Sequence, residues 1–191
     1  MIWNLPNILT WLRILAIPLV ALLFLFGGHG PRDLSEPVSG LVFAAAAVTD
    51  TLDGYLARRL GQTTRLGAFL DPVADKLIVA VALVLIVSRD PRPLMVLTAA
   101  VIIGREIAIS ALREWMAGIG QRTAVAVSRI GKYKTIAQMV GLTMLLFRHE
   151  LLGLPIYRLG QWLTVLAAVL TLISMALYLR AAWPHLVAPH H

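Results

Sequence analysis

Four aspartates lie close together in the first half of the chain, at spacings that suit cation binding. They are Asp50, Asp53, Asp71 and Asp75, four of the six aspartates in the sequence. The members of each pair are three or four residues apart, so on a helix both carboxylates of a pair point to one face, about one turn apart. Two such pairs facing each other would form a nest of four carboxylates, which suits hard divalent cations.

The chemistry of this nest follows from its ligand atoms. All of them would be carboxylate oxygens, and no histidine lies nearby in the sequence, which favours Mg²⁺, Mn²⁺ or Ca²⁺ over Zn²⁺. Two divalent cations would formally balance the four carboxylates. Two metals a few ångströms apart are the usual clamp for in-line displacement at phosphorus.

The composition indicates an integral membrane protein. Of the 191 residues, 59% are hydrophobic and 14% are charged, and the mean hydropathy is +0.79, whereas a soluble domain carries about 25% charged residues. We expect one domain, residues 1–191. The absence of cysteine excludes disulfides and cysteine metal sites. We attribute the net charge of +7 to membrane topology and to contact with anionic lipid or phosphate, and not to nucleic acid.

Six segments are long and apolar enough to cross a bilayer, which takes about 20 largely apolar residues. They are Ile8–Phe26, Pro37–Arg58, Leu70–Ser88, Pro93–Arg113, Gly131–Phe147 and Gly160–Leu179. The second segment reaches this length only if it includes Asp50 and Asp53, and the third only if it includes Asp71 and Asp75. The aspartates are therefore expected inside helices, not in loops.

The order of the segments predicts a polar cavity at one end of the bundle. In an up-down bundle of six transmembrane helices, the polar residues of the first five segments all fall on the same side of the membrane. The connections on that side and their flanking helix ends carry eight basic residues, against five on the other side. This excess favours a cavity that opens to the cytoplasm, with both termini inside.

The aspartates are also part of a longer pattern that resembles a known family. The pattern Asp50-x2-Asp53-Gly54-x2-Ala57-Arg58-x8-Gly67-x3-Asp71-x3-Asp75 is similar to the complete signature of the CDP-alcohol phosphotransferases. The resemblance implies a six-helix membrane fold, usually a homodimer, in which the four aspartates hold two divalent cations, Mg²⁺ or Mn²⁺. It implies that Asp75 is the general base. It also implies a CDP site lined by Asp53, Gly54, Ala57, Arg58, Thr64 and Gly67.

Three further stretches resemble one bacterial branch of this family. They begin at Leu5-Pro-Asn7, at Gly104-Arg105-Glu106 and at Gly131-Lys132-Tyr-Lys134. The resemblance implies transfer of a phosphatidyl group from CDP-diacylglycerol to sn-glycerol 3-phosphate, with phosphatidylglycerophosphate and CMP as products. It also implies a multi-pass protein of the bacterial inner membrane.

An acceptor that carries a phosphate needs cationic partners of its own. Four basic residues are expected at the cytoplasmic end beside the aspartates, and we assign them to the acceptor phosphate: Arg105, Arg113, Lys132 and Lys134. Arginine offers bidentate contact to phosphate, and lysine offers a point charge. Glu106 is expected to orient an arginine and not to bind metal.

Two alternatives stay open at this point. The same chemistry could serve another acceptor, such as inositol phosphate, serine or phosphatidylglycerol; the surplus of cations argues against serine, which carries no phosphate. A divalent-cation transporter with carboxylates in the membrane is a more distant alternative. It fits less well because the carboxylates cluster toward one face, with no matching acids toward the other.

Overall fold

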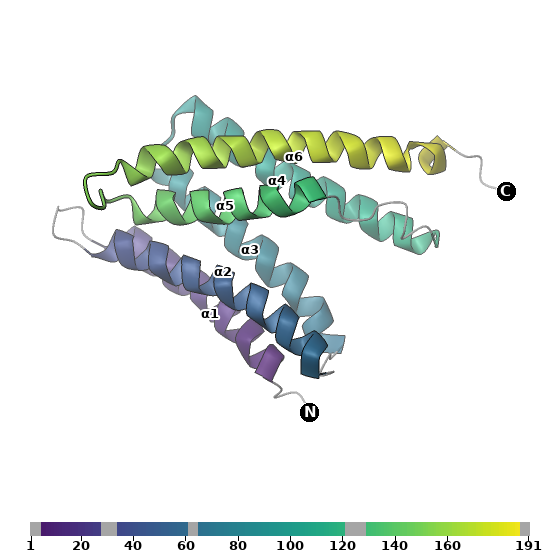
Figure 1. Ribbon diagram of the computed structural model, residues 1–191, viewed down its shortest axis with the longest axis horizontal. Helices are drawn as coiled ribbons and strands as arrows, with labels where there is room; N and C mark the ends of the chain where they lie inside the picture. The colour runs from purple at the N-terminus through teal and green to yellow at the C-terminus, as the bar shows by residue number, and fades with distance from the viewer. Residues whose placement is uncertain (1–4, 28–33, 61–64, 121–128, 188–191) are drawn as a thin grey trace.

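The computed structural model describes residues 5–27, 34–60, 65–120 and 129–187, and this part of the chain is helical (Figure 1). Its helices are α1 (Leu5–Phe26), α2 (Ser35–Leu60), α3 (Arg65–Arg89), α4 (Pro93–Gly118), α5 (Arg129–Phe147) and α6 (Ile156–Val187). Each of the six predicted segments corresponds to one of these helices, so the all-α fold is confirmed. The helices extend past several predicted ends because polar residues continue them beyond the apolar stretch.

Among the described residues, three helices are long and apolar enough to cross a membrane: Ile8–Phe26, Pro93–Gly118 and Ile156–Pro184. Two others contain shorter apolar stretches, Ser35–Thr49 in α2 and Tyr133–Phe147 in α5. The first of these stops directly before Asp50, yet α2 continues without a break to Leu60. Asp50 and Asp53 therefore belong to a helix, as the segment lengths predict.

The helices pack as two hairpins and two further helices that join them. α1 lies against α2, and α5 lies against α6, while α3 contacts α1, α2, α4 and α5 (Figure 1). The core between them is apolar: Val20, Phe24, Phe43, Ile86, Ile102, Leu142 and Leu146 are all at most 3% exposed. This packing places α3, which carries Asp71 and Asp75, in contact with most of the bundle.

Glycines let α5 and α6 approach closely. A Cβ atom at Gly141 would lie 2.5 Å from the Oγ1 atom of Thr164, and one at Gly160 would lie 2.8 Å from the Cβ atom of Met144. Neither position accepts a side chain without movement of its neighbour. Small residues at helix contacts are a common means of packing helices in membranes.

A polar network joins the helices at the end of the bundle where α3 leads into α4. Asp90 is 6% exposed and accepts hydrogen bonds from Arg92 at 2.6 Å, from Gln161 at 3.1 Å and from the hydroxyl of Tyr157. Arg92 caps the start of α4, and the other two donors lie in the first turns of α6. Asp90 thus ties the α3–α4 connection to α6.

A second part of this network holds α1, α2 and α5. Glu36 in the first turn of α2 pairs with Arg89 at 3.6 Å and with Arg148 at 3.7 Å. Arg89 also donates a hydrogen bond to the backbone carbonyl of Phe24 in α1 at 2.6 Å. We call Glu36, Arg89, Asp90, Arg92, Arg148, Tyr157 and Gln161 the closed-end network. It connects all six helices, so this end of the bundle is held by polar contacts.

Candidate active site

Asp71 and Asp75 lie one turn apart on α3 and line a polar cavity. The cavity has a volume of about 460 Å³, and its other walls include Lys76 on α3 and Arg105, Glu106 and Arg113 on α4. A smaller cavity of about 220 Å³ shares Asp75 and these α4 residues and extends to α5 and α6. The two cavities adjoin, so acidic and basic side chains from α3, α4 and α5 meet in one polar space, together with Tyr178 from α6. This confirms the prediction of a polar cavity within the bundle.

Asp71 is held in place from a neighbouring helix. The hydroxyl of Thr10 on α1 donates a hydrogen bond to its Oδ1 atom at 2.6 Å, and Thr10 itself is only 1% exposed. A donor that fixes a carboxylate in this way leaves its remaining lone pairs for another ligand, as in the outer shell of metal sites. The polar residues at the start of the first helix therefore reach the aspartates.

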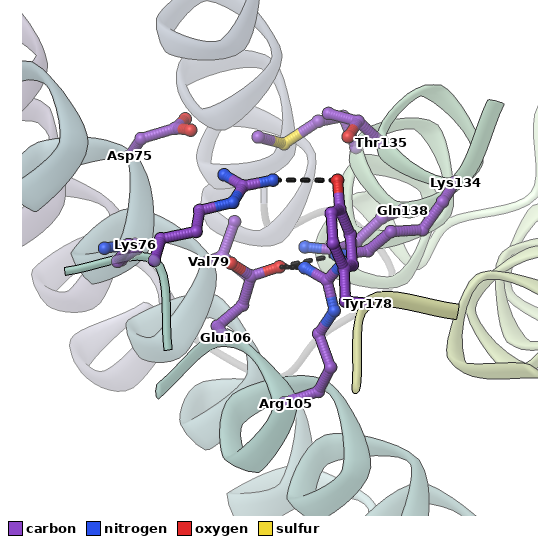
Figure 2. A pocket seen from close by; sticks show the side chains of 11 residues that line it. Asp75, Lys76, Val79, Arg105, Glu106, Lys134, Thr135, Gln138 and Tyr178 are labelled. Atoms are coloured by element: carbon purple, nitrogen blue, oxygen red, sulfur yellow. Dashed lines mark hydrogen bonds and ion pairs between the residues drawn. The ribbon is translucent and has the colours of Figure 1, made fainter. Parts of the chain in front are cut away.

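The basic side of the cavity is organised around Glu106. Its Oε1 atom accepts hydrogen bonds from Lys134 at 2.5 Å and from Arg105 at 3.1 Å, as the dashed lines in Figure 2 show. Arg105 also donates to the hydroxyl of Ser174 on α6 at 2.9 Å. Both cations are buried, at 8% exposure for Arg105 and 4% for Lys134. As the sequence predicts, Glu106 orients an arginine, and it holds a lysine as well.

Tyr178 on α6 lies beside both arginines of the cavity. Its hydroxyl accepts a hydrogen bond from Arg113 at 2.9 Å, and its ring centre lies 5.2 Å from the guanidinium carbon of Arg113 and 5.8 Å from that of Arg105. Contact with an aromatic face stabilises a cation and restricts its orientation. Tyr178 thus holds two basic side chains that reach the cavity from α4.

Sequence reasoning did not identify the α6 residues of this site. A signal was present, because Thr171, Ser174 and Tyr178 are spaced three and four residues apart in an otherwise apolar helix, which puts them on one face. All three are buried. Gln138 on α5 was also given no role, although it lines the smaller cavity.

The structure brings together five of the residues predicted for the site: Asp71, Asp75, Arg105, Arg113 and Lys134. Gly67, predicted for the CDP site, is buried near the start of α3. Thr64 lies outside the described residues. The backbone places six further predicted residues in helices, but their side chains lie outside the description: Asp50, Asp53, Gly54, Ala57, Arg58 and Lys132.

The described carboxylates suit a hard divalent cation. Asp71 and Asp75 are one turn apart, line the same cavity and offer oxygen ligands only, which is the donor type that Mg²⁺ and Mn²⁺ prefer. Within the described residues, no group of three or more potential ligands gathers. The helix that carries Asp50 and Asp53, α2, contacts α3.

Comparison with known proteins agrees with this geometry. Residues 3–173 match the model of the CDP-alcohol phosphatidyltransferase family. The chain is 52% identical over 184 residues to a CDP-diacylglycerol–glycerol-3-phosphate 3-phosphatidyltransferase of Pseudomonas fluorescens, covering 96% of this chain and 92% of that protein. It is 51% identical over 180 residues to the protein of the same name from Escherichia coli strain K12, covering 94% of this chain and 95% of the other.

Proposed function

The chain belongs to the CDP-alcohol phosphatidyltransferase family, and from this premise we propose that it transfers the phosphatidyl group of CDP-diacylglycerol to sn-glycerol 3-phosphate. The products are phosphatidylglycerophosphate and CMP. The relatives' name supports this choice of donor and acceptor. The observation that carries the proposal is the cavity in which the carboxylates of α3 face a cluster of cations from α4 and α5, of which Arg105 and Lys134 are buried.

The carboxylates form the metal and donor side of the proposed site. Asp50, Asp53, Asp71 and Asp75 would hold two Mg²⁺ or Mn²⁺ ions, a requirement that is general in the family. When bound, such ions neutralise charge on the pyrophosphate of the donor and on departing CMP. Six residues would line the CDP portion: Asp53, Gly54, Ala57, Arg58, Thr64 and Gly67. The bond between Thr10 and Asp71 supports this arrangement, since it fixes one of the four carboxylates.

Asp75 is the proposed general base. It is partly buried and lines both cavities, so it can reach an acceptor on the basic side while remaining beside Asp71. Asp75 takes the proton from the attacking hydroxyl of glycerol 3-phosphate. The hydroxyl oxygen then forms a bond to the phosphorus of the phosphatidyl group, and the bond from that phosphorus to CMP breaks.

The basic cluster is the proposed site for the acceptor phosphate. Arg105, Arg113 and Lys134 line the smaller cavity together with Asp75, and Lys132 precedes Lys134 by two residues on α5. Guanidinium groups bind phosphate oxygens in a bidentate manner. Because Glu106, Ser174 and Tyr178 fix the directions of these cations, the acceptor is held with its hydroxyl toward Asp75. Such orientation accelerates the displacement.

An apolar groove supports a route for the lipid. It has a volume of about 370 Å³ and runs between α2 and α5, with Ala44, Ala47 and Val48 on one wall and Ile136 and Val140 on the other. The groove also shares two lining residues, Thr135 and Met139, with the smaller polar cavity. The acyl chains of the donor would lie along this gap while its headgroup enters the cavity.

The setting of the protein is part of the same proposal. The apolar helices cross the inner membrane of a bacterium, and the cavity opens to the cytoplasm, where CDP-activated lipid and glycerol 3-phosphate meet. The excess of basic residues at the cavity end supports this direction. Two copies of the chain form a homodimer.

The test is CMP release by the purified protein in mixed detergent–lipid micelles. CDP-diacylglycerol and Mg²⁺ or Mn²⁺ are supplied with glycerol 3-phosphate, inositol phosphate or serine in separate reactions. We expect release with glycerol 3-phosphate only, abolished by a chelator. Release with another acceptor alone would overturn the assignment of the basic cluster. Uptake of Mn²⁺ into proteoliposomes without any CMP release would favour the transporter.

A further inference from the structure

Gln138 is a buried polar residue for which the reaction described above has no use. It lies on α5, its side chain is only 4% exposed, and it lines the smaller cavity. Its carboxamide Oε1 atom is buried, and no donor among the described residues reaches it. A buried acceptor without a donor is unfavourable. The atom is closed off from the cavity in this rotamer, so a bound ligand supplies the donor once the carboxamide turns toward the cavity.

The position of Gln138 indicates which ligand this is. Gln138 follows Lys134 by four residues on α5, so the two side chains share a helix face. Figure 2 shows Lys134, Gln138 and Tyr178 on one side of the cavity and Asp75 on the other. A molecule that bridges the basic cluster and Asp75 therefore passes the wall to which Gln138 belongs.

Glycerol 3-phosphate has a group that needs a partner at this place. Its phosphate is on C3, the attacking hydroxyl is on C1, and a second hydroxyl is on C2 between them. With the phosphate on the cations and the C1 hydroxyl at Asp75, the C2 hydroxyl faces the cavity wall. Burying this hydroxyl without a hydrogen bond would weaken binding.

We propose that the Oε1 atom of Gln138 accepts a hydrogen bond from the C2 hydroxyl of glycerol 3-phosphate and makes the enzyme specific for this acceptor. The inference rests on the proposed function, because it assumes that the acceptor spans the basic cluster and Asp75. It assigns Gln138 as a specificity-determining residue, which recognises the C2 hydroxyl although this hydroxyl takes no part in the reaction. An acceptor without this hydroxyl fits the same cavity but leaves the carboxamide oxygen unpaired.

The test compares two acceptors in two proteins. 3-Hydroxypropyl phosphate keeps the phosphate and the attacking hydroxyl of glycerol 3-phosphate but lacks the C2 hydroxyl. We expect the wild type to prefer glycerol 3-phosphate by roughly 10- to 100-fold in kcat/KM for CMP release, the range that one buried hydrogen bond supports. In Gln138→Leu the preference should fall to within about threefold of unity. The loss should come from a lower kcat/KM for glycerol 3-phosphate, with the kcat/KM for 3-hydroxypropyl phosphate little changed.

Controls separate this inference from damage to the fold and from failure of the proposed function. Thr98→Val removes another buried hydroxyl, one that bonds within α4, and should keep the full preference. Gln138→Met, closer to glutamine in shape, serves if the leucine variant is not recovered folded. A Gln138 variant that keeps the preference would overturn the inference, as would a wild type without any preference. A wild type that releases no CMP with glycerol 3-phosphate would instead overturn the proposed function.

Discussion

At the end of the bundle where α3 leads into α4, Asp90 is surrounded by donors from its own chain, and Glu36 lies between Arg89 and Arg148. At the other end, Asp71 and Asp75 line a cavity of about 460 Å³ together with the arginines of α4. Among the described residues, both ends therefore contain carboxylates and arginines in similar numbers. At the second end, the described groups border a space large enough for a ligand.

The difference lies in how the cations are held. In the closed-end network, the guanidinium of Arg92 donates two hydrogen bonds to a single carboxylate, that of Asp90. In the cavity, Arg113 bonds to the neutral hydroxyl of Tyr178, and Arg105 divides its bonds between Glu106 and Ser174. A guanidinium held partly by neutral groups keeps positive charge available for a phosphate. Arg89 at the closed end also bonds to a neutral group, the carbonyl of Phe24, so a neutral partner marks a functional charge where that charge also borders a cavity, as Arg105 and Arg113 do.

The largest expected effect is at Asp75. Replacement Asp75→Asn removes the proposed base but keeps the size and most of the polarity of the side chain. Because general-base catalysis contributes roughly 10²- to 10⁴-fold, turnover in the CMP-release assay should fall by about that factor. Mn²⁺, followed by electron paramagnetic resonance, should still bind to the remaining carboxylates but more weakly, so turnover is compared at saturating Mn²⁺. Full activity in this variant would contradict the assignment of Asp75 as base.

The matched change at the closed end should affect stability instead. Asp90→Asn weakens the bonds that three residues donate to a buried carboxylate, and loss of such bonds costs about 1–3 kcal/mol. We therefore expect the thermal unfolding temperature in detergent to fall by several degrees. The KM for glycerol 3-phosphate, measured at a temperature where the variant is folded, should stay within about twofold of the wild type. A large rise in KM would break the distinction between the two ends.

The surroundings of Asp90 also make the stability of the folded protein depend on pH. The hydrogen bonds from Arg92 hold the pKa of Asp90 well below its usual range. A carboxyl whose pKa is lowered by folding stabilises the folded state above its unfolded pKa of about 4 and loses this contribution as the pH falls toward the lower folded value. The gap in unfolding temperature between wild type and Asp90→Asn should therefore be constant from pH 7 to 5 and narrow below pH 4. A gap that widened in acid would contradict the ion pair.

A smaller effect is expected at Thr10, which belongs to the cavity end although it carries no charge. Thr10→Val removes the hydrogen bond to Asp71 and keeps the shape of the side chain. Partners of metal ligands typically change metal affinity by 10- to 100-fold, and we expect about tenfold weaker Mn²⁺ binding in titrations followed by electron paramagnetic resonance. Thr10→Ser, which retains the hydroxyl, should bind Mn²⁺ like the wild type. Equal Mn²⁺ affinities in the serine and valine variants would show that the Thr10 hydroxyl does not support the metal site.

The sequence alone was sufficient for the helices and for the common face of Asp71 and Asp75, because both depend on local spacing. Asp71 and Asp75 are four residues apart on one helix, so their common face follows from helix geometry. The closed-end network could not be predicted in this way. Arg89, Arg92 and Arg148 entered the sequence argument only as positive charges in connections, and their partners depend on how separate connections meet in space. The same is true of Tyr178, which is 65 residues from Arg113.

The smallest expected effect tests the comparison most closely, because each end of the bundle has a tyrosine that bonds to a charged residue. Tyr178→Phe removes the acceptor of the Arg113 bond but keeps the ring beside both arginines. Both cations therefore remain at the cavity, but the guanidinium of Arg113 is no longer held in one orientation. We expect a rise of about three- to tenfold in KM for glycerol 3-phosphate, with kcat and the unfolding temperature nearly unchanged. Tyr157→Phe removes a donor to Asp90 and should lower the unfolding temperature while leaving KM unchanged. If the two variants behaved alike, the polar contacts at both ends would serve only to hold the helices together.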